Sequence, residues 1–133
     1  MSGDILCAID FSDASRETVR WAADLARQLN SHLTILYVYR LNHANGQAIA
    51  LKRSIEKEAM TRFADLENEL LKGQGVPYDF KAEVGFVSDR VEFYTKTRPV
   101  RFLVIERRPG NREQLDDLMA NVSVPLIIVP HPN

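Results

Sequence analysis

Ile5-Leu6-Cys7-Ala8-Ile9-Asp10 is the stretch that decides the fold we expect. Five apolar residues run without a break and end at a carboxylate, a pattern typical of a strand buried on both faces of a parallel sheet. Ser12 stands where its hydroxyl can cap a following helix, and Asp13 falls in the first helical turn. Asp10 therefore lies at the carboxyl end of the strand, where ligands bind in open α/β sheets. From spacing alone, Asp10 can equally be a residue that only ends the strand.

Length and composition predict a single domain over residues 1–133. The chain is 45% apolar and 26% charged, with a formal net charge of −1, so no nucleic-acid-binding or anionic-membrane surface is indicated. No apolar run approaches the roughly 20 residues of a membrane span, and residues 1–4 lack the basic region of a secretory signal. The single cysteine, Cys7, excludes an intrachain disulfide and favours a cytoplasmic protein. We expect Cys7 to be a small buried hydrophobe rather than a nucleophile.

The rest of the chain alternates between strand and helix patterns. Apolar residues at three- and four-residue spacing predict helices, and runs rich in β-branched and aromatic residues predict strands. Helices are expected over about 13–29, 48–72, 88–96 and 113–121, with Ser88 as a cap, and strands over 33–39, 80–84, 102–105 and 124–129. The order βαβαβαβαβ implies one α/β domain, a doubly wound parallel sheet with helices on both faces. We expect the strands at 5–9 and 102–105 to be central and the alternating strand at 80–84 to lie at an edge.

A reversal of strand order beside the first strand would open a crevice. Asp10 would then face the charged loop Glu106-Arg107-Arg108-Pro109-Gly110 across it. Arg107 and Arg108 can bind phosphate bidentately, or the loop can simply be solvated, with its arginines paired to Glu106, Glu113 and Asp116.

The whole chain resembles the universal stress protein family. The resemblance rests on residues 5–12, on Leu33-Thr34-Ile35-Leu36-Tyr37-Val38, on Gly85 after the third strand and on Val124-Pro125-Leu126-Ile127-Ile128-Val129. It implies the strand order 3-2-1-4-5, frequent homodimers, a cytoplasmic role in stress tolerance and, in many members, a bound ATP or AMP.

The family's ATP signature follows the fourth strand and reads Gly-x-x-Gly, about nine residues, then Gly-Ser or Gly-Thr. Glycines there let backbone N–H groups approach the phosphates. In this chain Glu106 takes the place of the first glycine, only Gly110 is available, and no Gly-Ser or Gly-Thr follows. Arg101 stands at the position of the family's acidic residue before the fourth strand. The resemblance thus implies a degraded phosphate site.

The adenosine half of the family's site is better kept. Asp10, followed by Phe11 and Ser12, matches the acidic residue that ends the first strand, and Val38 matches the position whose backbone contacts adenine. Both also fit plain structural roles, a strand-ending carboxylate and a core valine. If a nucleotide binds, we expect Asp10, Phe11, Ser12 and Val38 at its adenosine end, and Arg107, Arg108 and Gly110 at its phosphates.

No sequence feature indicates a metal site or a catalytic centre. His32, His43 and His131 are far apart and have no metal-ligand spacing. The chain has no Gly-x-Ser-x-Gly elbow and no dinucleotide fingerprint.

Three functions remain open from the sequence. The first is a non-enzymatic regulatory or binding protein of the stress-protein type, without a cofactor. The alternative is an adenine-nucleotide binder, or slow ATPase, that uses the loop arginines and binds ATP or AMP weakly. The third is a small flavodoxin-like electron-transfer domain.

The last strand suggests a homodimer. It is short and apolar, Leu126-Ile127-Ile128-Val129, and the strand order that the resemblance implies leaves it at the sheet edge. An exposed apolar edge favours pairing with a second copy.

Overall fold

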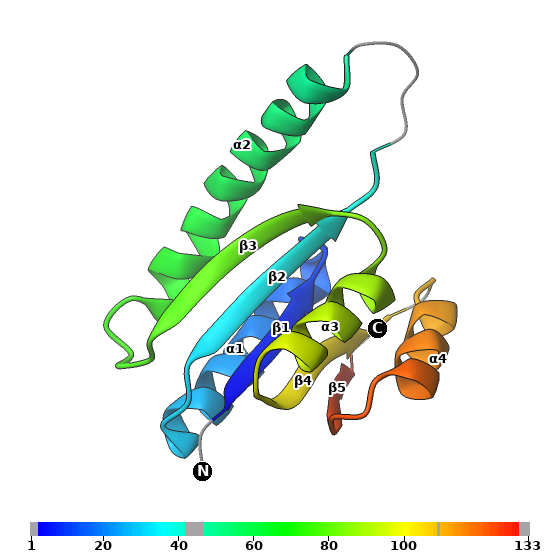
Figure 1. Ribbon diagram of the computed structural model, residues 1–133. Coiled ribbons are helices and arrows are strands. Elements are labelled where there is room, and N and C mark those ends of the chain that lie inside the picture. The colour runs from blue at the N-terminus through cyan, green and yellow to red at the C-terminus, as the bar shows by residue number, and fades with distance from the viewer. Residues whose placement is uncertain (1–2, 42–46, 109, 131–133) are drawn as a thin grey trace.

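Strands and helices alternate along the chain in the computed structural model, which describes residues 3–41, 47–108 and 110–130. The elements are β1 (Asp4–Ile9), α1 (Asp13–Leu29), β2 (Leu33–Tyr39), α2 (Ala48–Leu66), η1 (Glu67–Leu71), β3 (Tyr78–Val84), α3 (Val87–Thr97), β4 (Val100–Arg107), α4 (Arg112–Asn121) and β5 (Leu126–Pro130). The η1 segment is a π-helical turn that continues α2 (Figure 1).

The strands form one parallel sheet in the order β3-β2-β1-β4-β5. β1 lies at the centre, between β2 and β4, and five of its six residues are buried. β3 forms one edge and, as its alternating sequence predicts, is only partly covered. The expected α/β class, strand order and central first strand are confirmed.

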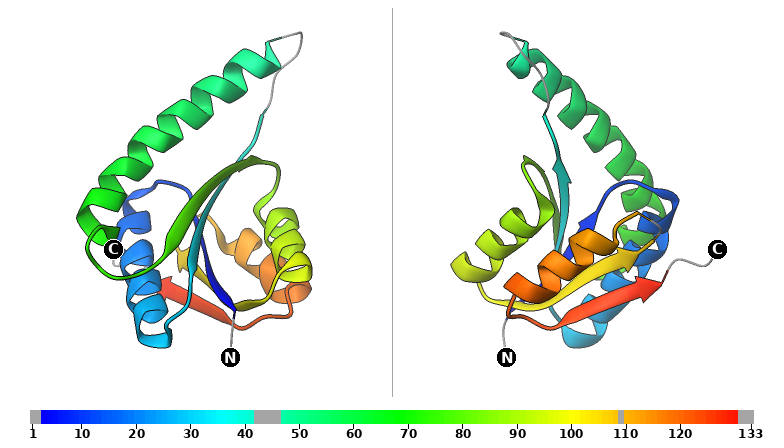
Figure 2. Two further views of the ribbon diagram at one scale, coloured as in Figure 1. Left: turned by 60° about the vertical axis from the view of Figure 1, so that its left-hand side comes forward. Right: turned by 90° about the vertical axis from the view of Figure 1, so that its right-hand side faces the viewer.

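Helices cover both faces of the sheet (Figure 2). On one face, α1, the end of α2 and η1 pack on side chains such as Ile5, Ile35 and Val104. On the other face, α3 and α4 pack on Leu6, Leu36 and similar residues. The amino-terminal part of α2 extends past the sheet (Figure 1), and Ile49 there is 68% exposed.

Several expected boundaries need correction, and both β3 and β4 begin two residues earlier than expected, at Tyr78 and Val100. α2 does not run as one α-helix to Lys72, because the π turn at its end rotates Leu71 into the core, where it is 1% exposed. α3 begins after Phe86 rather than at Ser88, and no side-chain cap is formed there. β5 begins at Leu126 rather than Val124, because Pro125 has no N–H and contributes only its carbonyl, which accepts from the Leu103 N–H at 3.0 Å.

The most consequential correction concerns Glu106. The charged sequence after Ile105 predicts a loop, yet β4 continues through Arg107. Glu106 pairs in register with Val129 of β5 and is only 3% exposed. The sheet therefore carries a carboxyl group into its interior at the carboxyl end of a central strand.

Candidate functional site

The turn between β1 and α1 is built around Asp10. The Ser12 N–H donates to Asp10 Oδ1 at 2.9 Å, and Ser15 Oγ donates to the same oxygen at 3.3 Å. Ser12 does stand at the N-cap of α1, but contrary to expectation its hydroxyl makes no capping hydrogen bond, and the Ser15 N–H donates instead to the Ser12 carbonyl at 3.0 Å. Asp10 therefore has the structural role that the sequence left open for it, because it stabilises the turn that ends β1.

Phe11 takes a strained conformation in this turn. Its φ is 61°, in the left-handed region that non-glycine residues rarely adopt. The ring packs edge-on against Tyr37 and Phe80, with centroids 4.9 and 6.0 Å away. These aromatic contacts stabilise the turn. This turn holds Asp10 at the edge of the sheet where the carboxyl ends of the strands lie.

The β4–α4 connection faces Asp10 from the neighbouring strand. The Arg108 guanidinium forms an ion pair with the Asp10 carboxylate, and its Nε lies 3.8 Å from Glu106 Oε1. Asn111 holds the connection in shape, because its Nδ2 donates to the Glu106 carbonyl at 2.8 Å and its Oδ1 accepts from the Arg108 N–H at 3.0 Å. Adjacent parallel strands thereby bring together the groups that we call the crevice triad: Asp10, Glu106 and Arg108.

The two carboxyl groups of the crevice triad have opposite electrostatic settings. Burial acts to raise the pKa of Asp10, but hydrogen bonding from Ser12 and the charge of Arg108 outweigh it, so its pKa lies below the usual value. Burial and the charge of Asp10 raise the pKa of Glu106 to about 7. Within the described part of the chain, Glu106 Oε2 is buried without a hydrogen-bond partner. Asp10 is therefore the ionised member at neutral pH, while Glu106 is poised between its two forms.

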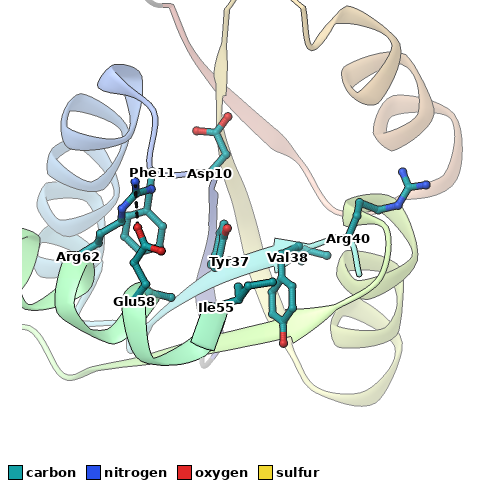
Figure 3. A pocket seen from close by; sticks show the side chains of 10 residues that line it. Asp10, Phe11, Tyr37, Val38, Arg40, Ile55, Glu58 and Arg62 are labelled. Atoms are coloured by element: carbon teal, nitrogen blue, oxygen red, sulfur yellow. Dashed lines mark ion pairs between the residues drawn. The ribbon is translucent and has the colours of Figure 1, made fainter. Parts of the chain in front are cut away.

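A pocket of about 410 Å³ lies between α2 and the carboxyl ends of β1 and β2 (Figure 3). Its wall is largely Tyr37, Val38, Ile55 and Phe11, with the Arg62–Glu58 ion pair of 3.4 Å beside Phe11. Asp10 also lines it, but Figure 3 shows the carboxylate pointing away from Tyr37. The pocket therefore combines aromatic and aliphatic side chains with the charged Glu58 and Arg62, and it meets the crevice triad at Asp10, which belongs to both.

The structure does not bring the seven residues expected at a nucleotide site together in one place. Asp10, Phe11 and Val38 share the pocket, and Arg108 reaches Asp10 from the other side. Ser12 faces a second hollow, beside Asp13 and Arg16. The side chain of Arg107 is exposed, and so is Gly110, whose φ is 95°.

Sequence reasoning missed several residues of this region. Tyr37, Ile55 and Arg62 line the pocket, and Asn111 fastens the crevice loop. The role of Asn111 could have been predicted from the sequence, because an asparagine just before a helix commonly forms hydrogen bonds with nearby backbone groups. The pocket residues could not have been predicted in this way, since they come together only through the way in which α2 crosses the sheet.

Features elsewhere do not add a second chemical centre. Cys7 is fully buried, and burial and Glu106 raise the pKa of its thiol well above the usual value, which fits the expected inert cysteine. His32 lies at the amino edge of the sheet, 3.3 Å from Asp79, while His43 and His131 fall outside the described residues. The described residues contain no group of three or more potential metal ligands, and no helix among them is long and apolar enough to span a membrane.

Comparison with known proteins identifies the family. The model of the universal stress protein family matches residues 1–130. The chain belongs to the universal stress protein family. No curated protein is significantly similar to this universal stress protein in sequence.

Solved structures share its fold at low sequence identity. UspA from Lactobacillus plantarum is 17% identical, with a TM-score of 0.79 over 96% of this chain and 97% of that one. A family member from Burkholderia pseudomallei is 18% identical, with a TM-score of 0.77 over 96% of each chain. The Archaeoglobus fulgidus universal stress protein in complex with dAMP is 16% identical, with a TM-score of 0.68 over 96% of this chain and 97% of that one.

Proposed function

We propose that this protein is a non-enzymatic regulatory binding protein of the universal stress protein family, acting in the cytoplasm in stress tolerance, with a degraded phosphate site. The observation that carries the proposal is the buried carboxyl group of Glu106, at the end of β4 where the family's ATP signature begins with glycine. A glycine there leaves room for phosphate oxygens to reach backbone N–H groups. A carboxyl group fills that room and, when ionised, repels the phosphates.

The arginines do not fully replace the missing glycines. Arg108 turns into the crevice but is engaged with Asp10, whereas the Arg107 side chain is exposed. A triphosphate needs several donors that point inward together. One guanidinium already bound to a carboxylate is a poor substitute, so hydrolysis of ATP is not supported.

A second candidate is an adenine-nucleotide binder that holds a single phosphate group with Arg108. The pocket offers Tyr37, Val38 and Ile55 as surfaces against which a base could pack, and a related family member has been solved in complex with dAMP. In this case a nucleoside monophosphate would bind more readily than ATP.

Analysis of the purified protein tests the proposal. Denaturing the protein and separating the released small molecules by chromatography should yield no ATP, and incubation with ATP should produce no ADP. Calorimetry at about pH 8 should give no low-micromolar dissociation constant for ATP. Co-purified ATP, or low-micromolar binding lost in Arg108→Ala or Asp10→Ala, would instead establish the nucleotide binder.

We also propose a homodimer through β5, the edge strand drawn in red in Figure 2. Ile128 is 36% exposed and Leu126 and Ile127 are partly covered, while Val129 is buried within the protomer. Backbone pairing of two β5 edges would cover Ile128, and Pro130 would limit its length because proline lacks an N–H.

Light scattering at micromolar concentration should show a dimer for the wild-type protein and a monomer for Ile128→Asp. Ile49→Asp is the matched control, since Ile49 is exposed on α2 and should leave the dimer intact. A wild-type monomer, or a dimer that survives Ile128→Asp, would contradict this arrangement.

A further inference from the structure

The crevice triad has one feature that the proposed function leaves unexplained. Glu106 is 3% exposed, yet its Oε2 has no hydrogen-bond partner in the described part of the chain. Buried carboxylates are normally paired and fully hydrogen-bonded, because an ionised group is costly to bury, and the Arg108 Nε, 3.8 Å from Glu106 Oε1, offsets that cost only in part. A carboxyl group left in this state is stable when it carries a proton, and its position beside a functional crevice suggests a use for that proton.

The charges around Glu106 come from a few groups. Asp10 and Cys7 face it from the β1 side and Arg108 from its own connection, while Asn111 and Val129 contribute no charge. The Cys7 thiol stays neutral, because its pKa is raised well above the usual value. The crevice triad therefore carries no net charge when Glu106 is protonated and one negative charge when it is ionised.

We propose that Glu106 makes the crevice a proton-linked oxyanion site, in which a phosphate or sulfate group binds beside Arg108 while the Glu106 carboxyl carries a proton, so that binding to the ionised form takes up one proton from solvent. The inference rests on the proposed function, in which Glu106 stands in place of a glycine cradle. Arg108 and Asp10 are 30% and 31% exposed, so the guanidinium is within reach of a solute while Glu106 lies behind it. A guanidinium has five N–H donors in a planar fork, enough to hold Asp10 and an oxyanion together.

The coupling follows from the like charges. An oxyanion within about 4–6 Å of a carboxyl group favours its neutral form. Burial and Asp10 raise the pKa of Glu106 to about 7. A bound anion raises this pKa further, so a proton is drawn from solvent onto the carboxyl group. The site would thus bind oxyanions in mildly acidic conditions and release them as the pH rises.

Sulfate is the appropriate probe, because it keeps its two charges over the whole range. Its affinity, followed by NMR titration of the wild-type protein, should be roughly tenfold higher at about pH 6 than at about pH 8. Glu106→Gln should bind sulfate with the same affinity at both values. Glu113→Gln, which removes an exposed carboxylate at the start of α4, should keep the wild-type pH dependence.

Three results would overturn the proposal: no sulfate binding at either pH, equal wild-type affinities at the two values, or an unchanged pH dependence in Glu106→Gln. Comparing AMP with inorganic phosphate at about pH 6 then identifies the source of the oxyanion. Tighter AMP binding with the same dependence on Glu106 supports a nucleotide phosphate, and equal affinities support free phosphate. Failure of the proposed function is seen separately, as low-micromolar ATP binding by the wild-type protein at about pH 8.

Discussion

Replacing Glu106 by glutamine is expected to strengthen ATP binding by up to about three powers of ten at about pH 8. At that pH most Glu106 carboxyls are ionised, since the pKa is about 7. Two like charges about 4 Å apart repel by roughly 4 kcal/mol at an effective dielectric constant near 20, and about 1.4 kcal/mol corresponds to a factor of ten. Glutamine keeps the size of the side chain and removes only the charge.

Calorimetry with ATP on the wild-type protein and the variant measures the effect. Glu106→Gly should bind ATP at least as tightly as Glu106→Gln, because it also vacates the space in front of the β4 backbone. The control Glu113→Gln should bind as the wild-type protein does, since Glu113 is exposed on α4. Unchanged affinity in Glu106→Gln would show that the Glu106 charge does not oppose the phosphates.

The free energy of unfolding of the wild-type protein should fall by about 3 kcal/mol between about pH 5 and pH 8. Burial and Asp10 raise the pKa of Glu106 from 4.5 to about 7, so in this interval the folded state binds the proton more tightly than the unfolded state. Stability is therefore highest on the acidic side, is lost as the pH rises through about 7, and levels off above it. The lowered pKa of Asp10 acts only in more acidic solution.

Urea unfolding at several pH values tests this dependence. Glu106→Gln cannot ionise, so its stability should stay nearly constant over the interval and exceed that of the wild-type protein by about 3 kcal/mol at about pH 8. The two proteins should be almost equally stable at about pH 5. A wild-type stability that rises with pH here, or the same slope in the variant, would mean that Glu106 is ionised throughout.

Most of the fold could be predicted because its signals are local. The unbroken apolar run at residues 5–9 predicts a central strand, and α1 and β2 have the predicted bounds. The π turn of η1 was not predictable in this way. It depends on whether Leu71 or only Leu70 reaches the core, and the packing of α1 and β3 decides that.

The candidate site was predicted in part. The sequence placed Asp10 opposite the arginine loop, and the ion pair between Asp10 and Arg108 bears this out. Only Arg108 turns inward, while the side chain of Arg107 is exposed, because successive residues of an extended chain point to opposite sides. It did not predict the pocket wall of Tyr37, Ile55 and Arg62, because those residues meet only where α2 crosses the sheet.

By itself, the sequence determined the alternation of strands and helices, the central place of β1, the missing glycines after β4 and the family to which the chain belongs. These features depend on residue types and their spacing along the chain. The tertiary structure alone decided the state of Glu106. A charged residue after an apolar run is typical of a loop, but pairing with β5 keeps Glu106 in the sheet, between the charges of Asp10 and Arg108 and away from water. Desolvation and neighbouring charge arise only when distant segments pack together, so no local pattern in the sequence could set the pKa of this carboxyl group.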